Sequence, residues 1–348
     1  LDTSLATEAY HQAGEAYLQA NDIAASKNAL QKVIAINPES MKAKEAQEYL
    51  KNLYIPEVAQ SKGSQFSASL LTGFLYDDNV LLETSSTASQ SEDTVSFLSA
   101  LGRYQFKPNK NVAYRFYQNY HSHSDRQFRD YDVQDHNFSL NISPLRFQDR
   151  LNLDYQFQFA FLGNEHYLNY YTFGTQYLYE KSDTRVTELS YQLQVKRYYN
   201  IEQTFPTSSD RNAISHQVGV RHAVLLDSDI NLRVSYLFEL DRAGSSSAED
   251  DWSFMGHRVK SGITLPAWRK LTTAVDFEYL FRPYDNDNEF APGTKRRDQG
   301  YLVNIIFSRP LGERFQLVFS YIYQRNDSNI ASFDYSRSVY GLLTTVRF

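Results

Sequence analysis

Residues 151–161 read LNLDYQFQFAF, with a large apolar side chain at every odd position and a polar or small one at every even position. Successive side chains of a β-strand point to opposite faces, so this alternation predicts a strand with one apolar and one polar face. Similar segments follow one another between residues 65 and 348, with no helical segment between them. A closed antiparallel membrane barrel explains this repetition better than a soluble sheet does.

The alternation predicts fourteen strands in an all-β, up-and-down transmembrane barrel. They span residues 65–76, 94–106, 111–121, 132–142, 150–161, 167–180, 185–198, 211–224, 230–241, 252–265, 270–282, 298–308, 313–325 and 334–348. Every second connection is short, as at 107–110 and 309–312, whereas most of the others are longer and rich in Ser, Asp, Asn and Gly, as at 77–93 and 283–297. Short periplasmic turns and long external loops are typical of outer-membrane barrels, so we expect both termini in the periplasm.

The polar face of each predicted strand would line the lumen of the barrel. An Arg or Lys on the lipid face near the midplane would cost about 2–4 kcal/mol, which sets the register strongly. The lumen charges are of both signs, which argues against a filter of one sign and is compatible with ion pairs or with a polar, heterogeneous cargo. The predicted lumen residues are Asp154, Gln156, Glu188, Lys196, Arg221, Arg233, Glu239, Arg258, Lys260, Asp276, Glu278 and Arg347.

The first 55 residues differ from the rest because their apolar spacing is helical. Gly14, Tyr17, Leu30 and Pro38 fall at the small, aromatic, large apolar and terminating-proline positions of a 34-residue helical-hairpin repeat. The segment therefore resembles one tetratricopeptide repeat with a capping helix. We expect three parts: a periplasmic helical segment at 1–55, a linker at 56–64 and the barrel at 65–348.

Composition agrees with a barrel and narrows the chemistry. The mean hydropathy is −0.54, and no apolar run approaches the roughly 20 residues of a membrane helix. The 27 Tyr and 23 Phe residues suit aromatic girdles at the two membrane interfaces. The chain has no cysteine, which excludes disulfides and thiolate sites, and its net charge of −6 gives no reason to expect nucleic acid. Because the chain starts at Leu1 without a basic and apolar leader, we expect that a signal peptide has been removed.

The sequence predicts neither an enzyme nor a cofactor site. No Gly-x-Ser-x-Gly motif occurs. Asp285, Asp287 and Glu289 place oxygen ligands at alternate positions of a predicted external loop, as in sites for calcium. The loop lacks the glycine and spacing of a helix-loop-helix calcium site, so we interpret it as a solvated acidic loop and predict no metal.

The last strand carries a signal of its own. Tyr340, Leu342, Val346 and the terminal Phe348 share one face of an alternating segment. This pattern resembles the C-terminal aromatic signal of outer-membrane proteins, which implies the barrel-assembly machinery as a partner.

Residues 73–80 read GFLYDDNV, an aromatic strand end that breaks at once into Asp-Asp-Asn, as a strand exit does. Together with the tetratricopeptide-like segment, the linker and fourteen strands to a terminal Phe, this motif resembles the surface lipoprotein assembly modifier family. The resemblance implies an outer-membrane protein of a Gram-negative cell that helps to move a secreted protein or lipoprotein client to the surface. It implies contact with outer-membrane lipid and lipopolysaccharide. The chain departs from the family in having about one repeat instead of several.

Three other functions fit the same pattern. Helical repeats fused to barrels also occur in polymer export, so an exopolysaccharide export pore is one alternative. A passive diffusion porin and a membrane anchor for a larger surface assembly are the others.

Overall fold

The protein is described here by a computed structural model. It describes residues 29–30, 32–33, 42, 66–82, 91–105, 112–143, 150–182, 184–201, 208–226, 230–244, 252–266, 270–288 and 291–348. Ala29, Leu30, Lys32, Val33 and Lys42 are helical, and Leu30 and Val33 are fully buried. Of the other repeat-like positions, Gly14, Tyr17 and Pro38 lie outside the described residues, as does the predicted linker at 56–64. The tetratricopeptide-like repeat therefore stays a prediction.

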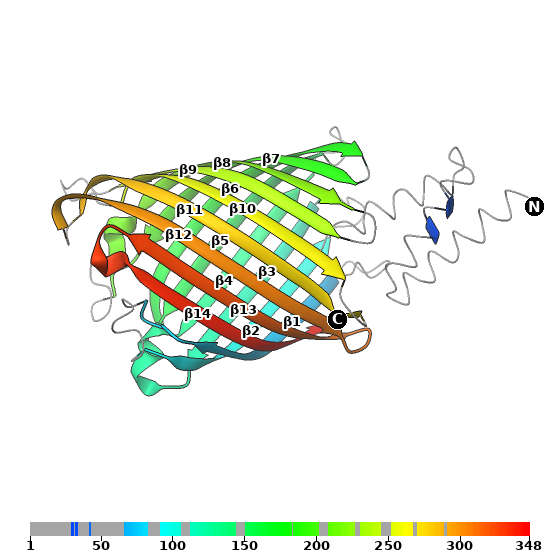
Figure 1. The fold of residues 1–348 in the computed structure, drawn as a ribbon, viewed down its shortest axis with the longest axis horizontal. Coiled ribbons are helices and arrows are strands. Elements are labelled where there is room, and N and C mark those ends of the chain that lie inside the picture. The colour runs from blue at the N-terminus through cyan, green and yellow to red at the C-terminus, as the bar shows by residue number, and fades with distance from the viewer. Residues whose placement is uncertain are drawn as a thin grey trace, which may run out of the picture.

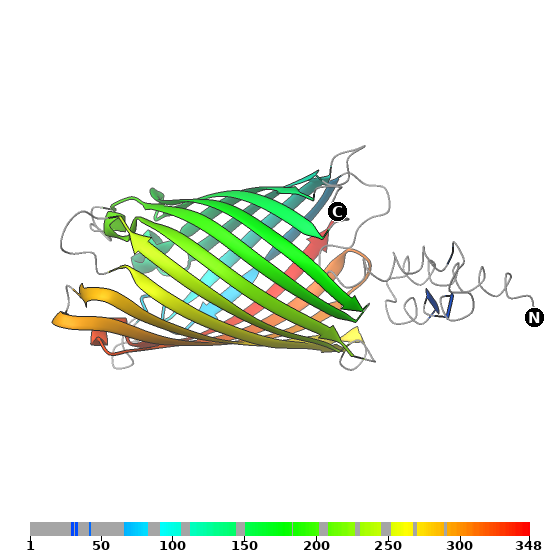
Figure 2. The same ribbon diagram turned by 90° about the horizontal axis from the view of Figure 1, so that it is seen from above.

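The described strands form one closed antiparallel barrel of fourteen strands, which confirms the predicted architecture of the wall (Figures 1 and 2). Each strand pairs with its neighbours in sequence, and the first pairs with the last. The strands are β1 (Phe66–Asp77), β2 (Asp93–Gln105), β3 (Val112–His123), β4 (Val133–Ile142), β5 (Leu151–Leu162), β6 (Glu165–Ser182), β7 (Arg185–Tyr198), β8 (Ala213–Leu225), β9 (Asn231–Ala243), β10 (Phe254–Pro266), β11 (Thr272–Asn288), β12 (Ala291–Pro310), β13 (Phe315–Ser328) and β14 (Tyr335–Arg347).

The outer face of the wall is apolar. Phe74, Val218 and Leu342 are 63%, 54% and 58% exposed, and the pairing register sets Val218 beside Phe238 and Phe74 beside Leu342 on the same face. An apolar surface of this extent requires a covering, and lipid supplies it around an alternating barrel strand. Within the described residues, no helix is long and apolar enough to cross a membrane.

The two ends of the barrel differ. We call the end that carries Phe348 the turn end, because the short connection at 311–314 lies there, and the opposite end the loop end (Figure 1). The loop end carries three 3-10 helices: η2 (Arg126–Tyr131), η4 (Ser208–Arg211) and η6 (Ala331–Phe333). Its connections range from the two-residue turn at Gly163 and Asn164, both with positive φ, to the stretch at 78–92 between β1 and β2.

The prediction of a long loop at 283–297 is wrong. Strand β11 continues to Asn288 and β12 begins at Ala291, so the pair forms a hairpin that extends past its neighbours at the loop end (Figure 1). Asp287 pairs with Lys295 after an irregularity in the register. The run Asp-Asn-Asp-Asn favours a turn by composition. It is extended because its last two residues pair with β12, while the backbone of Asp285 donates to the carbonyl of Ser253 at 2.9 Å.

The seam between β1 and β14 closes the ring. Pairing runs from Ser69 beside Arg347 to Asp77 beside Val339. Gly73 allows the two backbones to approach closely, since a Cβ added there would lie 2.1 Å from the carbonyl oxygen of Leu342. The wall therefore has no free strand edge among its described strands, which removes the template for edge-to-edge association.

Candidate functional site

The structure places the predicted lumen residues on the inner face of the wall, opposite the exposed apolar side chains. On β9, for example, the exposed Val234 and Tyr236 alternate with Arg233, while Glu239 further along the same strand is buried. The inner face thus carries the charges that are disfavoured in the middle of the lipid-facing side. Most of these charges cluster on strands β7 to β11, where the structure pairs them between strands that are adjacent or two apart.

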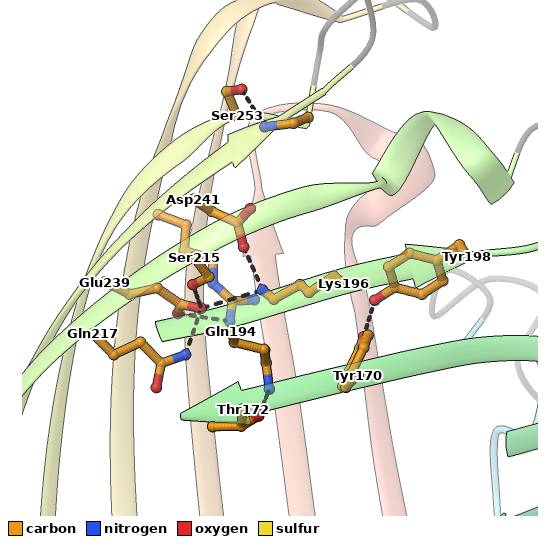
Figure 3. A network of polar contacts seen from close by, with 12 residues as sticks. Tyr170, Thr172, Gln194, Lys196, Tyr198, Ser215, Gln217, Glu239, Asp241 and Ser253 are labelled. Carbon is orange, nitrogen blue, oxygen red and sulfur yellow. Dashed lines mark hydrogen bonds and ion pairs between the residues drawn. The ribbon is translucent and has the colours of Figure 1, made fainter. Parts of the chain in front are cut away.

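Glu239 is the centre of a buried polar network (Figure 3). Its Oε1 accepts hydrogen bonds from Nε2 of Gln217 at 3.2 Å and from Oγ of Ser215 at 3.4 Å. The ammonium group of Lys196 lies 3.5 Å from the same oxygen and also forms an ion pair with the buried carboxylate of Asp241. Three strands, β7, β8 and β9, therefore converge on one carboxylate.

Two arginines approach the other side of Glu239. NH2 of Arg282 lies 3.6 Å from Oε2, and NH2 of Arg258 lies 4.0 Å from it. Arg258 also lies 3.4 Å from Oε1 of Glu278, whose second oxygen is 2.7 Å from Nζ of Lys260. A buried carboxylate is costly unless charges of opposite sign and hydrogen bonds compensate it, and here three cations do so. We call Lys196, Glu239, Asp241, Arg258, Lys260, Glu278 and Arg282 the lumen charge network.

The remaining predicted lumen residues form smaller contacts. Arg233 donates to Asp276 at 2.8 Å and to Thr264 at 3.0 Å. Arg221 donates to Glu188 at 2.5 Å, with its side chain largely exposed. Elsewhere on the inner face, Asp154 accepts hydrogen bonds from Asn141 and Gln156, and Arg347 donates to Gln316 at 2.6 Å.

Sequence reasoning missed two members of the network, Asp241 and Arg282. Both lie on the lumen parity of strands that were recognised, two residues beyond Glu239 and four beyond Glu278. Extending the same alternation to the strand ends would have found them. The contact of Asp241 with Lys196 joins β9 to β7, and that of Arg282 with Glu239 joins β11 to β9. Both contacts depend on the relative register of strands that are two apart in the barrel, which alternation within one strand does not give.

A second cluster lies at the loop end, where side chains from three connections meet side chains from β6 and β12. The guanidinium carbon of Arg296 lies 3.4 Å from the ring centre of Phe333, and that ring contacts Trp252 edge to face at 6.3 Å. Arg211 stacks over Trp252 at 4.4 Å and donates to the hydroxyl of Tyr167 at 3.2 Å. Arginine over aromatic faces is attracted by the ring quadrupole. We call these five residues the mouth bridge.

The mouth bridge links parts of the wall that are far apart around the ring. Arg211 belongs to η4 just before β8, and Phe333 belongs to η6 just before β14, which is six strands away in a ring of fourteen. Arg296 is buried and held by Asp298, to which Nε donates at 3.0 Å and NH2 at 2.5 Å. The loop-end mouth is therefore spanned by noncovalent contacts between connections.

The Asp-Asp-Asn motif after the first strand joins β1 to β14. Arg337 donates to both carboxylate oxygens of the buried Asp77, and Nδ2 of Asn79 donates to the carbonyl of Ser336 at 2.8 Å. Asp78 accepts from the backbone of Ser338 at 2.6 Å. We call these contacts the seam clasp. The motif was interpreted as a strand exit, and the structure adds a role in fastening the loop end of the seam.

The acidic residues that the sequence offers as a weak metal candidate, Asp285, Asp287 and Glu289, were expected in an external loop. Asp285 and Asp287 belong to strand β11 and not to a loop, and Asp285 forms an ion pair with Arg242. Glu289 lies outside the described residues. Within the described part of the chain, no group of three or more His, Cys, Asp or Glu side chains is arranged to hold a metal ion.

The terminal signal residues lie on the outer face of β14, from Tyr340, which pairs with Tyr76, to Phe348 at the turn end. Tyr340 and Leu342 are exposed on the lipid side of β14, and the backbone of Phe348 donates to the carbonyl of Ala68 at 2.8 Å. The side chain of Phe348 is exposed. Recognition of these residues during assembly stays a prediction.

No protein-family model and no curated protein matches the chain. Among solved structures, it is similar to an anion-selective porin from Comamonas acidovorans, with 7% identity, a TM-score of 0.45 and coverage of 81% of this chain and 98% of that one. It is similar to CdiB from Acinetobacter baumannii, with 8% identity, a TM-score of 0.44 and coverage of 82% and 60%. A bacterial polysaccharide outer membrane secretin matches with 9% identity, a TM-score of 0.41 and coverage of 81% and 98%. At these identities and TM-scores, the likenesses identify no function.

The wall itself decides the class of protein. A closed, even-stranded antiparallel barrel with an apolar outer face and a charged inner face is the architecture by which β-proteins span the outer membrane. The chain is an outer-membrane β-barrel. The charged residues of its inner face line the interior that lipid does not reach.

Proposed function

We propose that this barrel helps to move specific proteins or lipoproteins across the outer membrane to the cell surface. The observation that carries the proposal is the lumen charge network, in which cations and carboxylates alternate across β7 to β11. An extended polypeptide presents charges of both signs and polar backbone groups. A lumen wall with charges of both signs can exchange its internal ion pairs for ion pairs with such a cargo. A wall with charges of one sign would bind the cargo's opposite charges tightly and repel its like charges.

The mouth bridge supports a gated passage. Its contacts are cation–π and edge-to-face pairs, each worth about 0.5–2 kcal/mol, so a few new contacts with a client can replace them. In this proposal the loop end faces outward and the helical segment at 1–55 meets the client in the periplasm. The client class itself comes from the sequence resemblance described above.

The proposal is tested by deleting the gene in the host bacterium and labelling intact cells with a membrane-impermeant biotin reagent. We expect one or a few surface proteins to lose labelling while their total amounts in the cell stay the same. Complementation with the wild-type chain restores the labelling. An unchanged surface proteome, with the barrel shown to be present in the parent strain, would sink the proposal.

A matched pair of variants assigns the effect to the lumen. Arg258→Gln with Arg282→Gln removes two cations that face Glu239, whereas Arg221→Gln removes a more exposed cation of the same inner face. The first variant is expected to lower surface labelling of the client and the second to leave it near the wild-type level. Equal labelling with both variants would show that the lumen charge network does not handle cargo.

A passive diffusion porin is distinguished by planar-bilayer recordings. Contacts that span the mouth predict low conductance from the wild-type barrel. A steady, fully open conductance together with an unchanged surface proteome would favour the porin.

A further inference from the structure

Two arginines mark the loop-end boundary of the apolar band on the outer face of β7 to β9. The outward side chains of β7 run from Arg185 to Arg197, both exposed, and the residues between them are Thr187, Leu189, Tyr191, Leu193 and Val195. Twelve residues of strand span about 40 Å, or about 30 Å along the barrel axis at a tilt of about 40°. This matches the roughly 30 Å hydrocarbon core of a bilayer, so Arg197 lies at the loop-end interface and Arg185 at the other.

Arg242 lies at the same level on β9. Ile214 of β8 pairs with Val195 on one side and with Arg242 on the other, so these three form one row of the outer face. In the next row toward the loop end, Asn212 lies between β7, which carries Arg197, and Gly244. The backbone N–H of Gly244 donates to the carbonyl of Asn212 at 2.6 Å. Because Gly244 has no side chain and that of Asn212 is short, this row leaves space between Arg197 and Arg242.

That space is a groove of about 610 Å³. Its lining includes Val195, Arg197, Tyr199, Ile214, Arg242 and Gly244. Toward the membrane midplane, the next outward residue of β8 is the exposed His216, whose Nδ1 lies 3.0 Å from the hydroxyl of Tyr191, and the exposed Val218 and Val220 follow it. The groove therefore has a cationic rim at the interface and an apolar floor at Ile214, and below His216 the valines continue the apolar surface into the hydrocarbon region.

The cations of the rim keep donors for a ligand. Arg242 forms an ion pair with Asp285 through NH1, which leaves further donors of its guanidinium group. Among the residues that the structure describes, no acidic side chain pairs with Arg197. Two guanidinium groups beside a hydrophobic column suit a phosphorylated headgroup whose acyl chains run down the wall, since arginine binds phosphate oxygens with paired hydrogen bonds.

We propose that this groove binds the phosphorylated glycolipid of the outer leaflet, the lipid A part of lipopolysaccharide. Arg197 and Arg242 contact its phosphate groups, and Ile214 and Val218 contact its acyl chains. The inference rests on the proposed function only for orientation, because it requires the loop end to face outward. It concerns the outer face of the wall and needs no client in the lumen.

The test uses the full-length protein purified in detergent and titrated with lipopolysaccharide under native mass spectrometry. The double variant Arg197→Ser, Arg242→Ser is expected to bind at least about tenfold more weakly than the wild type, as the loss of charge-assisted hydrogen bonds implies. Arg185→Ser is the matched control, because it removes an exposed outward arginine of the same strand at the opposite interface. It is expected to bind like the wild type.

Two further arms identify the ligand chemistry. Dephosphorylated lipid A is expected to bind the wild type as weakly as lipopolysaccharide binds the double variant. Phosphatidylethanolamine–phosphatidylglycerol vesicles are expected not to displace lipopolysaccharide. Equal affinity of the double variant and the wild type, an equal loss with Arg185→Ser, or displacement by the vesicles would each overturn the inference. Heat-modifiable gel mobility checks that each variant is folded. Because no arm measures surface display, failure of the proposed function leaves these outcomes readable.

Discussion

Arg337 of β14 donates through Nε to Oδ1 of Asp77 on β1 at 2.9 Å, and its NH2 group reaches the second carboxylate oxygen. The two residues lie 260 positions apart in sequence and meet at the loop end of the seam. Asp77 is only 1% exposed. The first and last strands are thus joined at this end by a bidentate ion pair in addition to their backbone ladder, which makes the pair geometrically specific.

Breaking this pair should weaken closure of the barrel. Asp77→Asn leaves the guanidinium of Arg337 without its charge partner, and we expect a loss of about 2–3 kcal/mol in the free energy of unfolding. This loss is smaller than the 3–5 kcal/mol, roughly, that follows when a fully buried ion pair is broken, because the side chain of Arg337 is 33% exposed. Urea unfolding in lipid vesicles, followed by tryptophan fluorescence, measures the change.

The control for the seam is the pair of Arg221 and Glu188 in the middle of the sequence, whose arginine side chain is 56% exposed. Glu188→Gln should cost no more than about 1 kcal/mol, as exposed ion pairs do. Equal losses for the two variants would contradict a special contribution from the seam clasp.

The wall could be predicted from sequence because its signal is local. Alternation such as that of residues 151–161 reports which side of a strand meets lipid, and the fourteen segments predicted in this way correspond to the fourteen strands of the closed barrel. The loop-end extension of β11 could not be predicted, because Asp285 and Asp287 favour turns by composition but are held extended, Asp287 by pairing with Lys295 of β12 and Asp285 by a backbone hydrogen bond to the carbonyl of Ser253. Strand ends outside the membrane lack the lipid that enforces the alternation.

The candidate site could be predicted only in part, for a related reason. Glu239 and Arg258 were assigned to the lumen by parity alone, but their contact depends on strand register and side-chain reach. The mouth bridge has no periodic signal, because Arg211 and Trp252 lie in connections. Asp77 was recognised as part of a motif, yet its partner Arg337 lies at the other end of the chain.

Opening the mouth bridge should raise conductance. Trp252→Ala removes the ring that contacts both Arg211 and Phe333, so the connections before β8 and β14 lose their link. In planar bilayers we expect single-channel conductance several times that of the wild type. Phe307→Ala, which truncates a lipid-facing ring, is the control and should leave conductance unchanged. Identical traces for Trp252→Ala and the wild type would show that the bridge does not restrict the passage.

Removing the charge of Glu239 should shift ion selectivity toward anions. The carboxylate balances Lys196, Arg258 and Arg282, and Glu239→Gln leaves these cations in excess. A unit charge a few ångströms from a hydrated path contributes about 1 kcal/mol, in favour of anions and against cations, so the anion-to-cation permeability ratio should rise by up to about thirtyfold. Reversal potentials in a salt gradient, recorded in the Trp252→Ala background, give this ratio. Asp154→Asn, which removes a carboxylate from another part of the inner face, is the comparison. A reversal potential of Glu239→Gln equal to that of the Trp252→Ala barrel alone would contradict the prediction.

The orientation of the barrel can be measured directly because the chain has no cysteine of its own. Lys295→Cys introduces a thiol on the exposed loop-end hairpin, and Glu313→Cys introduces one in an exposed connection of the turn end. If the loop end faces outward, a membrane-impermeant maleimide labels the first variant in intact cells and the second only after the outer membrane is permeabilised. The reverse pattern would refute the proposed orientation and, with it, the lipid A site.

The lipid-facing surface should reject charge at a depth that the inner face accepts. Val218 lies in the middle of β8 on the outer face and is 54% exposed to the surroundings of the barrel. Val218→Arg should lower the free energy of unfolding in vesicles by about 2–4 kcal/mol, because the guanidinium enters hydrocarbon near the bilayer midplane.

Gln176→Arg, on the inner face of β6, is the matched control and should change stability by less than about 1 kcal/mol, because water in the lumen solvates the new charge. If the two arginines cost the same, the face that we assign to lipid is solvated. The side chains that we assign to lipid would then not face the membrane. A shift of register by one residue would have this effect, because it moves every side chain of a strand to the opposite face.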